Sequence, residues 1–141
     1  MNYEYWLPTA AMNFPGVSDL ISTYQARARG TSADALGYYV APFAYAQLQV
    51  VEQAIVATAG VDDAELAGYT RTATFPTVVG DVTFGALGEW AVPRVLTVQF
   101  RDIGSSDISE FAKPGTRIVV APAGYASGEL AVPFRGSAKG R

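Results

Sequence analysis

The order of apolar and polar positions along the chain predicts helices in the first half and strands in the second. Residues 17–29 carry apolar side chains at the three- and four-residue spacing of one helical face. Pro15 precedes this run and Gly30 follows it, which is where proline and glycine begin and end helices. The pattern therefore predicts a helix over 17–29.

A second helical pattern covers the later part of residues 35–59. Leu48, Val51 and Ile55 recur at helical spacing, and glutamines and Glu52 fill other positions of the wheel. We expect a helix over 43–59 that buries these three residues and ends at Gly60, a natural C-cap. Pro42 lacks an amide proton, so either a longer helix kinks there or a new helix starts there.

The remaining elements are shorter. Residues 62–72 begin with two acids, which favours a helix N-terminus. Three runs with β-branched or alternating residues are predicted to be strands: 75–85, 94–103 and 116–122. Residues 1–6 are a candidate fourth strand. Residues 104–115 read as a polar connection, and no internal repeat is present.

Helices followed by strands favour a mixed fold. Three strands form a poor sheet by themselves, so the helices look made to cover a sheet whose central strands lie outside this chain. The 141 residues are 50% hydrophobic and 16% charged, which is more apolar than an average soluble domain. We expect the isolated chain to associate, as a homodimer, through apolar faces that it leaves uncovered.

Composition also narrows the chemistry. The net charge is −3, without the basic surface that nucleic-acid binding needs, so no nucleic-acid partner is expected. The sequence has no Cys and no His, which excludes disulfides, thiol chemistry, a serine–histidine triad and Cys/His zinc sites. No strand-to-helix glycine motif for phosphate appears at residues 80–88.

Two groups of acids are the remaining candidates for catalysis or metal binding. Their spacing is not that of a calcium loop, and a helix start or a solvated loop explains them as well; they are Asp62, Asp63 and Glu65, and Asp102, Asp107 and Glu110. We therefore predict no catalytic residue, no metal site and no cofactor, and we expect that the protein is not an enzyme.

Aromatic residues are the other candidates. Tyr38, Tyr39 and Tyr45 lie on or near a helix and are expected in the core. Tyr5 and Trp6, close to Pro8, can form one wall of a ligand pocket or pack against a neighbouring element. Residues 1–16 lack the basic start and long apolar run of a secretory signal, and we expect them to come from the middle of a fold.

Several short stretches, in order, resemble one family. They are YQARARG with Tyr24, Arg27 and Gly30; ALGYY with Ala35, Gly37 and Tyr38; the helix ending at Gly60; TFPTVVGDVTFGALG with Gly80, Phe84 and Gly88; VQF with Val98 and Gln99; and YASGELAVPF. Over residues 3–134 the chain resembles type I periplasmic solute-binding proteins, in the branched-chain amino acid branch of ABC importers.

The resemblance implies a fold and a domain organisation. The fold would be a partial α/β fold: helices and a few strands from the C-terminal part of a two-lobe protein whose lobes are joined by three crossovers. Residues 1–134 would form this incomplete lobe, with 1–8 at the third crossover, and 135–141 a polar tail. It also implies one long helix bent at Pro42. The family's Ser/Thr loop, which holds the carboxylate and amine of the ligand, has no counterpart here.

The function implied is the solute-binding component of an ABC importer in the periplasm. The partners would be a small solute, either a branched-chain amino acid or a related aromatic acid or amide, and a membrane permease. Tyr5 and Trp6 would lie at the cleft, with Trp6 favoured for the solute contact, and Trp90 would take no part. The alternatives are a ligand-sensing regulatory module of the same fold and a self-associating remnant without ligand binding.

Overall fold

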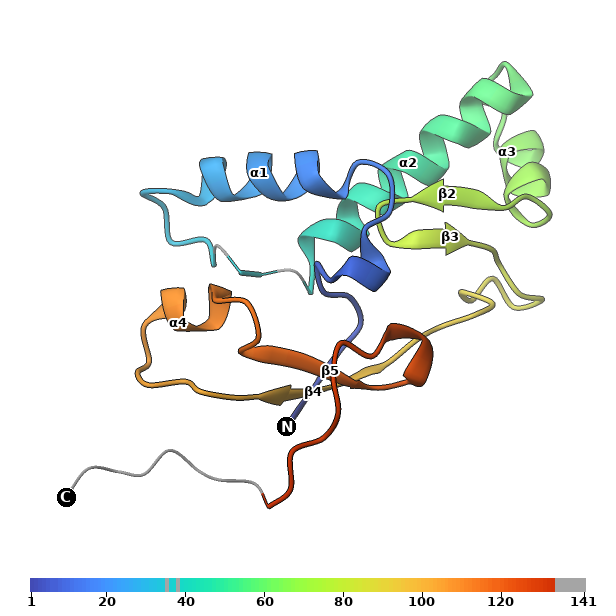
Figure 1. Cartoon of the computed structure of the whole chain (residues 1–141). Helices are drawn as coiled ribbons and strands as arrows, with labels where there is room; N and C mark the ends of the chain where they lie inside the picture. Colours follow the sequence, from blue (N-terminus) through green and yellow to red (C-terminus); the bar gives the residue numbers. More distant parts are fainter. Residues whose placement is uncertain (35, 38, 134–141) are drawn as a thin grey trace. The chain divides into compact units, whose positions relative to one another are not determined.

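The computed structural model describes residues 1–34, 36–37 and 39–133. Two compact units are present among the described residues (Figure 1): one formed by Met1–Ala11 with residues 95–133, and one formed by Met12–Arg94. Each unit contains both helices and short antiparallel strands. The expectations for Ala35, Tyr38 and the tail 135–141 fall outside the described residues.

Two helices of the Met12–Arg94 unit confirm the sequence pattern. Helix α1 spans Val17–Ala28, between Gly16 and Gly30, whose φ angles of 84° and 75° need the freedom of glycine. Helix α3 spans Asp63–Thr70. The Asp62 carboxylate accepts hydrogen bonds from Ala64 N at 3.0 Å and Glu65 N at 3.1 Å, so it satisfies two amides that the helix itself leaves free.

Helix α2 begins where the proline lies. It spans Ala41–Thr58, with Pro42 in its first turn, so the expected long helix with a bend at this residue is wrong. The missing amide of a first-turn proline would have had no helical acceptor, and proline therefore starts a helix easily. At the other end Ala59, not Gly60, adopts the left-handed conformation, with φ at 53°.

The run 75–85 forms a hairpin and not one strand. Strand β2, Phe75–Thr77, pairs antiparallel with β3, Gly80–Val82. Thr77 fixes the turn: its hydroxyl donates to Gly80 O at 2.7 Å and accepts from Val79 N at 3.1 Å. Gly80 has φ at 98°, and a Cβ there would lie 2.9 Å from the ring of Phe14. The turn thus requires glycine for two reasons.

The buried face of α2 is not the expected one. The residues that it buries are Pro42, Ala46, Val50 and Ala54. Leu48 is 68% exposed and Val51 is 51% exposed, which corrects the expectation that they form the core, and Ile55 is half-buried. The reason is the hairpin, because Gln49 Oε1 accepts from Val78 N at 2.9 Å and Gln53 Nε2 donates to Pro76 O at 3.1 Å.

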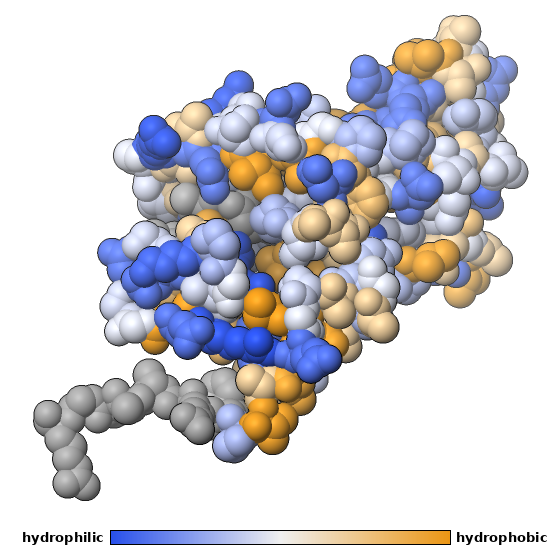
Figure 2. All heavy atoms as spheres, in the orientation of Figure 1, coloured by the Kyte–Doolittle hydropathy of each residue, from blue (hydrophilic) through white to orange (hydrophobic). Residues whose placement is uncertain are grey.

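Two tyrosines expected in the core are on the surface. Tyr39 is 61% exposed and Tyr45 is 46% exposed. Figure 2 shows hydrophobic atoms among hydrophilic ones on the face in view. Other large apolar side chains, among them Leu87 and Val56, are also exposed.

The other unit is built on a three-stranded antiparallel sheet in the order β1-β4-β5. The strands are Asn2–Glu4, Leu96–Phe100 and Arg117–Ala121, which confirms the two predicted strands and the candidate at residues 1–6. Leu96, Val98 and Val119 are fully buried. The register shifts between Thr97 and Val98, so the alternation is interrupted and Gln99 is buried next to Val98.

Short helical turns complete this unit. Helix α4, Ile108–Ala112, lies within the segment that the sequence indicated as a polar connection. Its Phe111 ring packs edge-on against Phe100, at 5.8 Å between centroids. The 3-10 turn η2, Ala123–Tyr125, also belongs to this unit, whereas η1, Ala10–Met12, ends on the first residue of the other unit.

Candidate functional site

The two predicted ligand contacts differ in exposure. Trp6 is fully buried at 0% exposure, whereas Tyr5 is 55% exposed and follows β1 directly. The chain bends at Tyr5, after the end of β1, and of the two side chains only Tyr5 is exposed to solvent. Tyr5 is the side chain that a solute can reach in this structure. Solute binding by either residue stays a prediction.

Glu4, beside Tyr5, is the titratable group of this region. Burial raises the pKa of the Glu4 carboxyl, and the Arg117 charge and a hydrogen bond from Asn2 oppose that shift in part. The Asn2 Nδ2 to Glu4 Oε1 distance is 3.0 Å. A perturbed pKa is a recognised feature of functional sites, but purely structural charge networks and burial perturb pKa values too.

An apolar groove in the Met12–Arg94 unit is the feature that sequence reasoning missed. Its cavity of about 420 Å³ lies between α2 and the segment from the hairpin to Trp90, and Phe43, Val50, Val79, Phe84 and Trp90 are among its walls. Phe84 and Trp90 form an antiparallel bridge, and the Phe43 and Trp90 ring centroids are 6.2 Å apart. Aromatic walls of this kind suit small apolar ligands.

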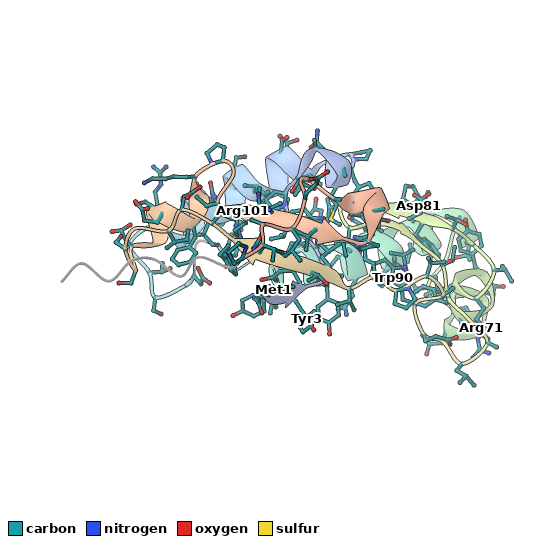
Figure 3. All side chains as sticks on the ribbon, turned by 60° about the horizontal axis from the view of Figure 1, so that its bottom comes forward. Met1, Tyr3, Arg71, Asp81, Trp90 and Arg101 are labelled. Carbon is teal, nitrogen blue, oxygen red and sulfur yellow. The ribbon has the colours of Figure 1, made fainter. Side chains whose placement is uncertain are left out.

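Arg94 contacts Trp90, one of the residues that line the groove. Its guanidinium lies 5.1 Å from the Trp90 ring centroid and 5.6 Å from that of Phe14, and it donates a hydrogen bond to Val79 O. Figure 3 labels Trp90. A cation placed over aromatic rings contributes about 0.5–2 kcal/mol. Arg94 therefore positions the indole, and the groove has a preformed wall.

One acid of each group caps a helix. Asp62 caps α3 as described, and Asp107 caps α4 by accepting from Ser109 N at 2.8 Å. This hydrogen bonding lowers the pKa of Asp107, and the ion pair with Lys113 lowers the pKa of Glu110. Within residues 1–133, apart from 35 and 38, no three acids gather as metal ligands do.

The glycine-containing stretch after β3 is unsuited to phosphate. The Glu89 carboxylate occupies the space where a Cβ on Gly85 would lie, and it accepts from Leu87 N at 2.9 Å. A free backbone amide is what a phosphate loop offers, and here a carboxylate already uses one.

Residues that carry the family resemblance have definite local roles. Tyr24 donates its hydroxyl hydrogen bond to Asp34 O at 2.7 Å, and a Cβ on Gly37 would lie 2.9 Å from that hydroxyl. Gln99, 2% exposed, accepts from Ala131 N at 2.9 Å and donates to Ala131 O at 3.0 Å. These positions depend on residue type because of packing and hydrogen bonding, and none of these contacts involves Tyr5 or Trp6.

Among the described residues, no helix combines the length and apolar character that crossing a bilayer requires. Comparison with known proteins yields no family model, no curated protein and no solved structure that matches the chain.

Proposed function

We propose that this chain is part of the solute-binding component of an ABC importer that takes up branched-chain amino acids or related small solutes in the periplasm. The chain would supply C-terminal elements of a two-lobe, type I binding fold. In the intact protein, closure of the lobes around the solute would precede delivery to the permease.

One observation carries the proposal: the residues of the resemblance stand where their type is needed. Gly37 leaves room for the Tyr24 hydroxyl, Gly80 leaves room for the Phe14 ring, and Gln99 holds the main chain of Ala131. These contacts give the residues that carry the resemblance definite local roles, and the order and spacing of those residues along the chain support the proposal.

The same reasoning refines the solute contact. Tyr5 is accessible and Trp6 is buried, so in the proposed cleft Tyr5 contacts the solute and Trp6 anchors the segment that carries it. A tyrosine offers an apolar ring and a hydroxyl, which suits a solute with an aliphatic side chain and a polar end.

A chimera tests the proposal. Residues 3–134 replace the corresponding segment of a branched-chain amino acid binding protein, and L-leucine binding is measured by calorimetry. We expect a dissociation constant within about 100-fold of the host's, equivalent to roughly 2.7 kcal/mol. A second chimera with the same boundaries, taken from another family member, is the positive control. Loss of binding in the first chimera alone would contradict the proposal.

Within that chimera, Tyr5→Ala tests the contact residue. We expect it to weaken L-leucine binding by about 1–3 kcal/mol, as loss of an aromatic contact does. Tyr45→Ala is the matched control, because Tyr45 is a similarly exposed tyrosine on α2. Equal effects of the two substitutions on L-leucine binding would contradict the assignment of Tyr5 as the solute contact.

A further inference from the structure

The segment Glu129–Val132 is held on its unit by side chains that bind its main chain. Gln99, on β4, makes two hydrogen bonds to one residue: it accepts from Ala131 N at 2.9 Å and donates to Ala131 O at 3.0 Å. The Gln99 side-chain amide thus pairs with Ala131 as a neighbouring strand's main chain would.

Arg101 extends this arrangement by one step along the segment. Its Nη2 donates to Glu129 O, and its Nε donates to Gln99 Oε1 at 2.9 Å, which fixes the amide orientation. Figure 3 labels Arg101. The two positions that are held, 129 and 131, are two residues apart, which is the repeat of an extended chain.

These hydrogen bonds are made to main-chain atoms of the segment and involve none of its side chains. Leu130 is 48% exposed and Val132 is 77% exposed. A cavity of about 440 Å³ lies beside the segment, with Met1, Gln99 and Leu130 among its walls. Gln99 itself is 2% exposed, and a buried amide without partners is costly. The site therefore needs an extended occupant but does not specify its sequence.

We propose that Gln99 and Arg101 form a clamp for the main chain of an extended peptide, which the chain's own Glu129–Val132 segment occupies, and that the same segment of a second copy can take its place. The resident segment has the advantage of being tethered, since a short tether gives an effective concentration in the millimolar range. Exchange between copies becomes measurable once the resident segment is released.

Ala131→Pro in the full-length chain releases it without changing the clamp. Proline has no amide proton for Gln99 Oε1. The probe is a fluorescein-labelled peptide with the sequence of residues 128–133, GELAVP, and the readout is fluorescence anisotropy. We expect Ala131→Pro to bind it at least about tenfold more tightly than the wild type does. Ala131→Ser keeps the main-chain donor and acceptor and should behave as the wild type.

Two further measurements identify the clamp. A probe that is N-methylated at the position of Ala131 should bind the Ala131→Pro chain at least about tenfold more weakly than the unmethylated probe does. The double variant Ala131→Pro, Gln99→Leu should no longer bind the unmethylated probe. In the wild-type chain, hydrogen exchange at the Ala131 amide should be slower than at the Val132 amide. The proposal is overturned if Ala131→Pro binds no more tightly than the wild type, if N-methylation has no effect, or if the Ala131 amide exchanges as fast as that of Val132.

Discussion

The two faces of α2 differ in a way that apolar content alone does not explain. The inner face buries Ala46, Val50 and Ala54, whereas the outer face leaves Leu48 68% exposed and Val56 74% exposed. The larger apolar side chains are thus the exposed ones. The comparison shows that the partner of a helix, and not the size of its side chains, decides which face is buried.

The partner here is the β2–β3 hairpin, beside which α2 lies (Figure 1). Small residues let a helix approach a neighbouring backbone closely, and Gln49 and Gln53 then reach Val78 N and Pro76 O. Backbone groups of a hairpin need hydrogen-bond partners when they are covered, and glutamine supplies both a donor and an acceptor. The inner face is therefore partly polar.

The largest loss should come from emptying the core between hairpin and helix. Phe75 is 1% exposed and packs edge-on against Tyr69 and Phe84, with centroids 5.9 Å and 6.4 Å apart. Phe75→Ala should lower the free energy of unfolding by about 3–5 kcal/mol, measured by urea denaturation followed by circular dichroism. Leu87→Ala, at a residue that is 94% exposed, is the control and should cost less than about 0.5 kcal/mol.

A smaller loss should come from overfilling the inner face. Ala54 is 2% exposed, and Ala54→Leu should cost about 1–3 kcal/mol, because the larger side chain separates α2 from the hairpin. Ala57→Leu, on the exposed side of the same helix, should leave the stability within about 0.5 kcal/mol. Equal costs for the two substitutions would mean that the inner face is not closely packed.

Local signals explain what the sequence could predict. The ends of α1 and α3 follow from Gly30 and Asp62, and β4 follows from its alternation; these signals act over a few residues. The buried face of α2 was not predictable, because apolar residues at helical spacing lie on both sides of the helix. The hairpin was missed because Thr77 makes a tight turn around Val78 and Val79, which look like strand residues.

The candidate site was predictable only in part. Aromatic residues near Pro8 suggested a pocket wall, but the sequence did not indicate that Trp6 is buried and Tyr5 exposed. The groove walls at Phe43 and Trp90 are distant in sequence and meet only through tertiary packing. Gln99 could have been noticed as a polar residue in an apolar strand, and its partner Ala131 could not.

The C-terminal end of α2 gives a smaller, stabilising change. Ala59 adopts φ at 53°, a conformation that costs a residue with a Cβ roughly 1 kcal/mol and glycine much less. Ala59→Gly should therefore raise the free energy of unfolding by about 0.5–1 kcal/mol, visible as a higher thermal midpoint. Ala57→Gly, inside the helix, should lower it by about the same amount. A loss of stability for Ala59→Gly would show that the residue is not left-handed.

A pH dependence of stability should come from Glu4. Burial raises the pKa of its carboxyl in the folded chain, so the folded state holds the proton more tightly than the unfolded state does. Its contribution to stability is present below the unfolded pKa, about 4.3, and is lost as the pH rises through the raised folded value. In thermal unfolding, the midpoint of the wild type should therefore fall as the pH rises above about 4.3, and Glu4→Gln should remove this fall. Glu52→Gln, on the exposed face of α2, is the control and should leave the fall in place. Identical pH profiles for Glu4→Gln and the wild type would contradict the assignment.

The smallest change in stability is expected at Leu48, where the spacing of apolar residues predicted a large one. Truncation of a buried leucine to alanine costs about 2–5 kcal/mol, but Leu48 is 68% exposed. We therefore expect Leu48→Ala to cost less than about 0.5 kcal/mol at concentrations too low for association.

The outer face of α2 should matter instead for self-association. The wild-type chain is expected to sediment as a homodimer at low micromolar concentration, and Leu48→Lys to sediment as a monomer with unchanged circular dichroism, because the charge disfavours covering that face. Tyr39→Lys, outside the helix at a residue that is 61% exposed, is the matched control and should stay dimeric. A loss of several kcal/mol for Leu48→Ala in the monomer would mean that the outer face of α2 is covered within the chain itself, and the contrast between its two faces would no longer hold.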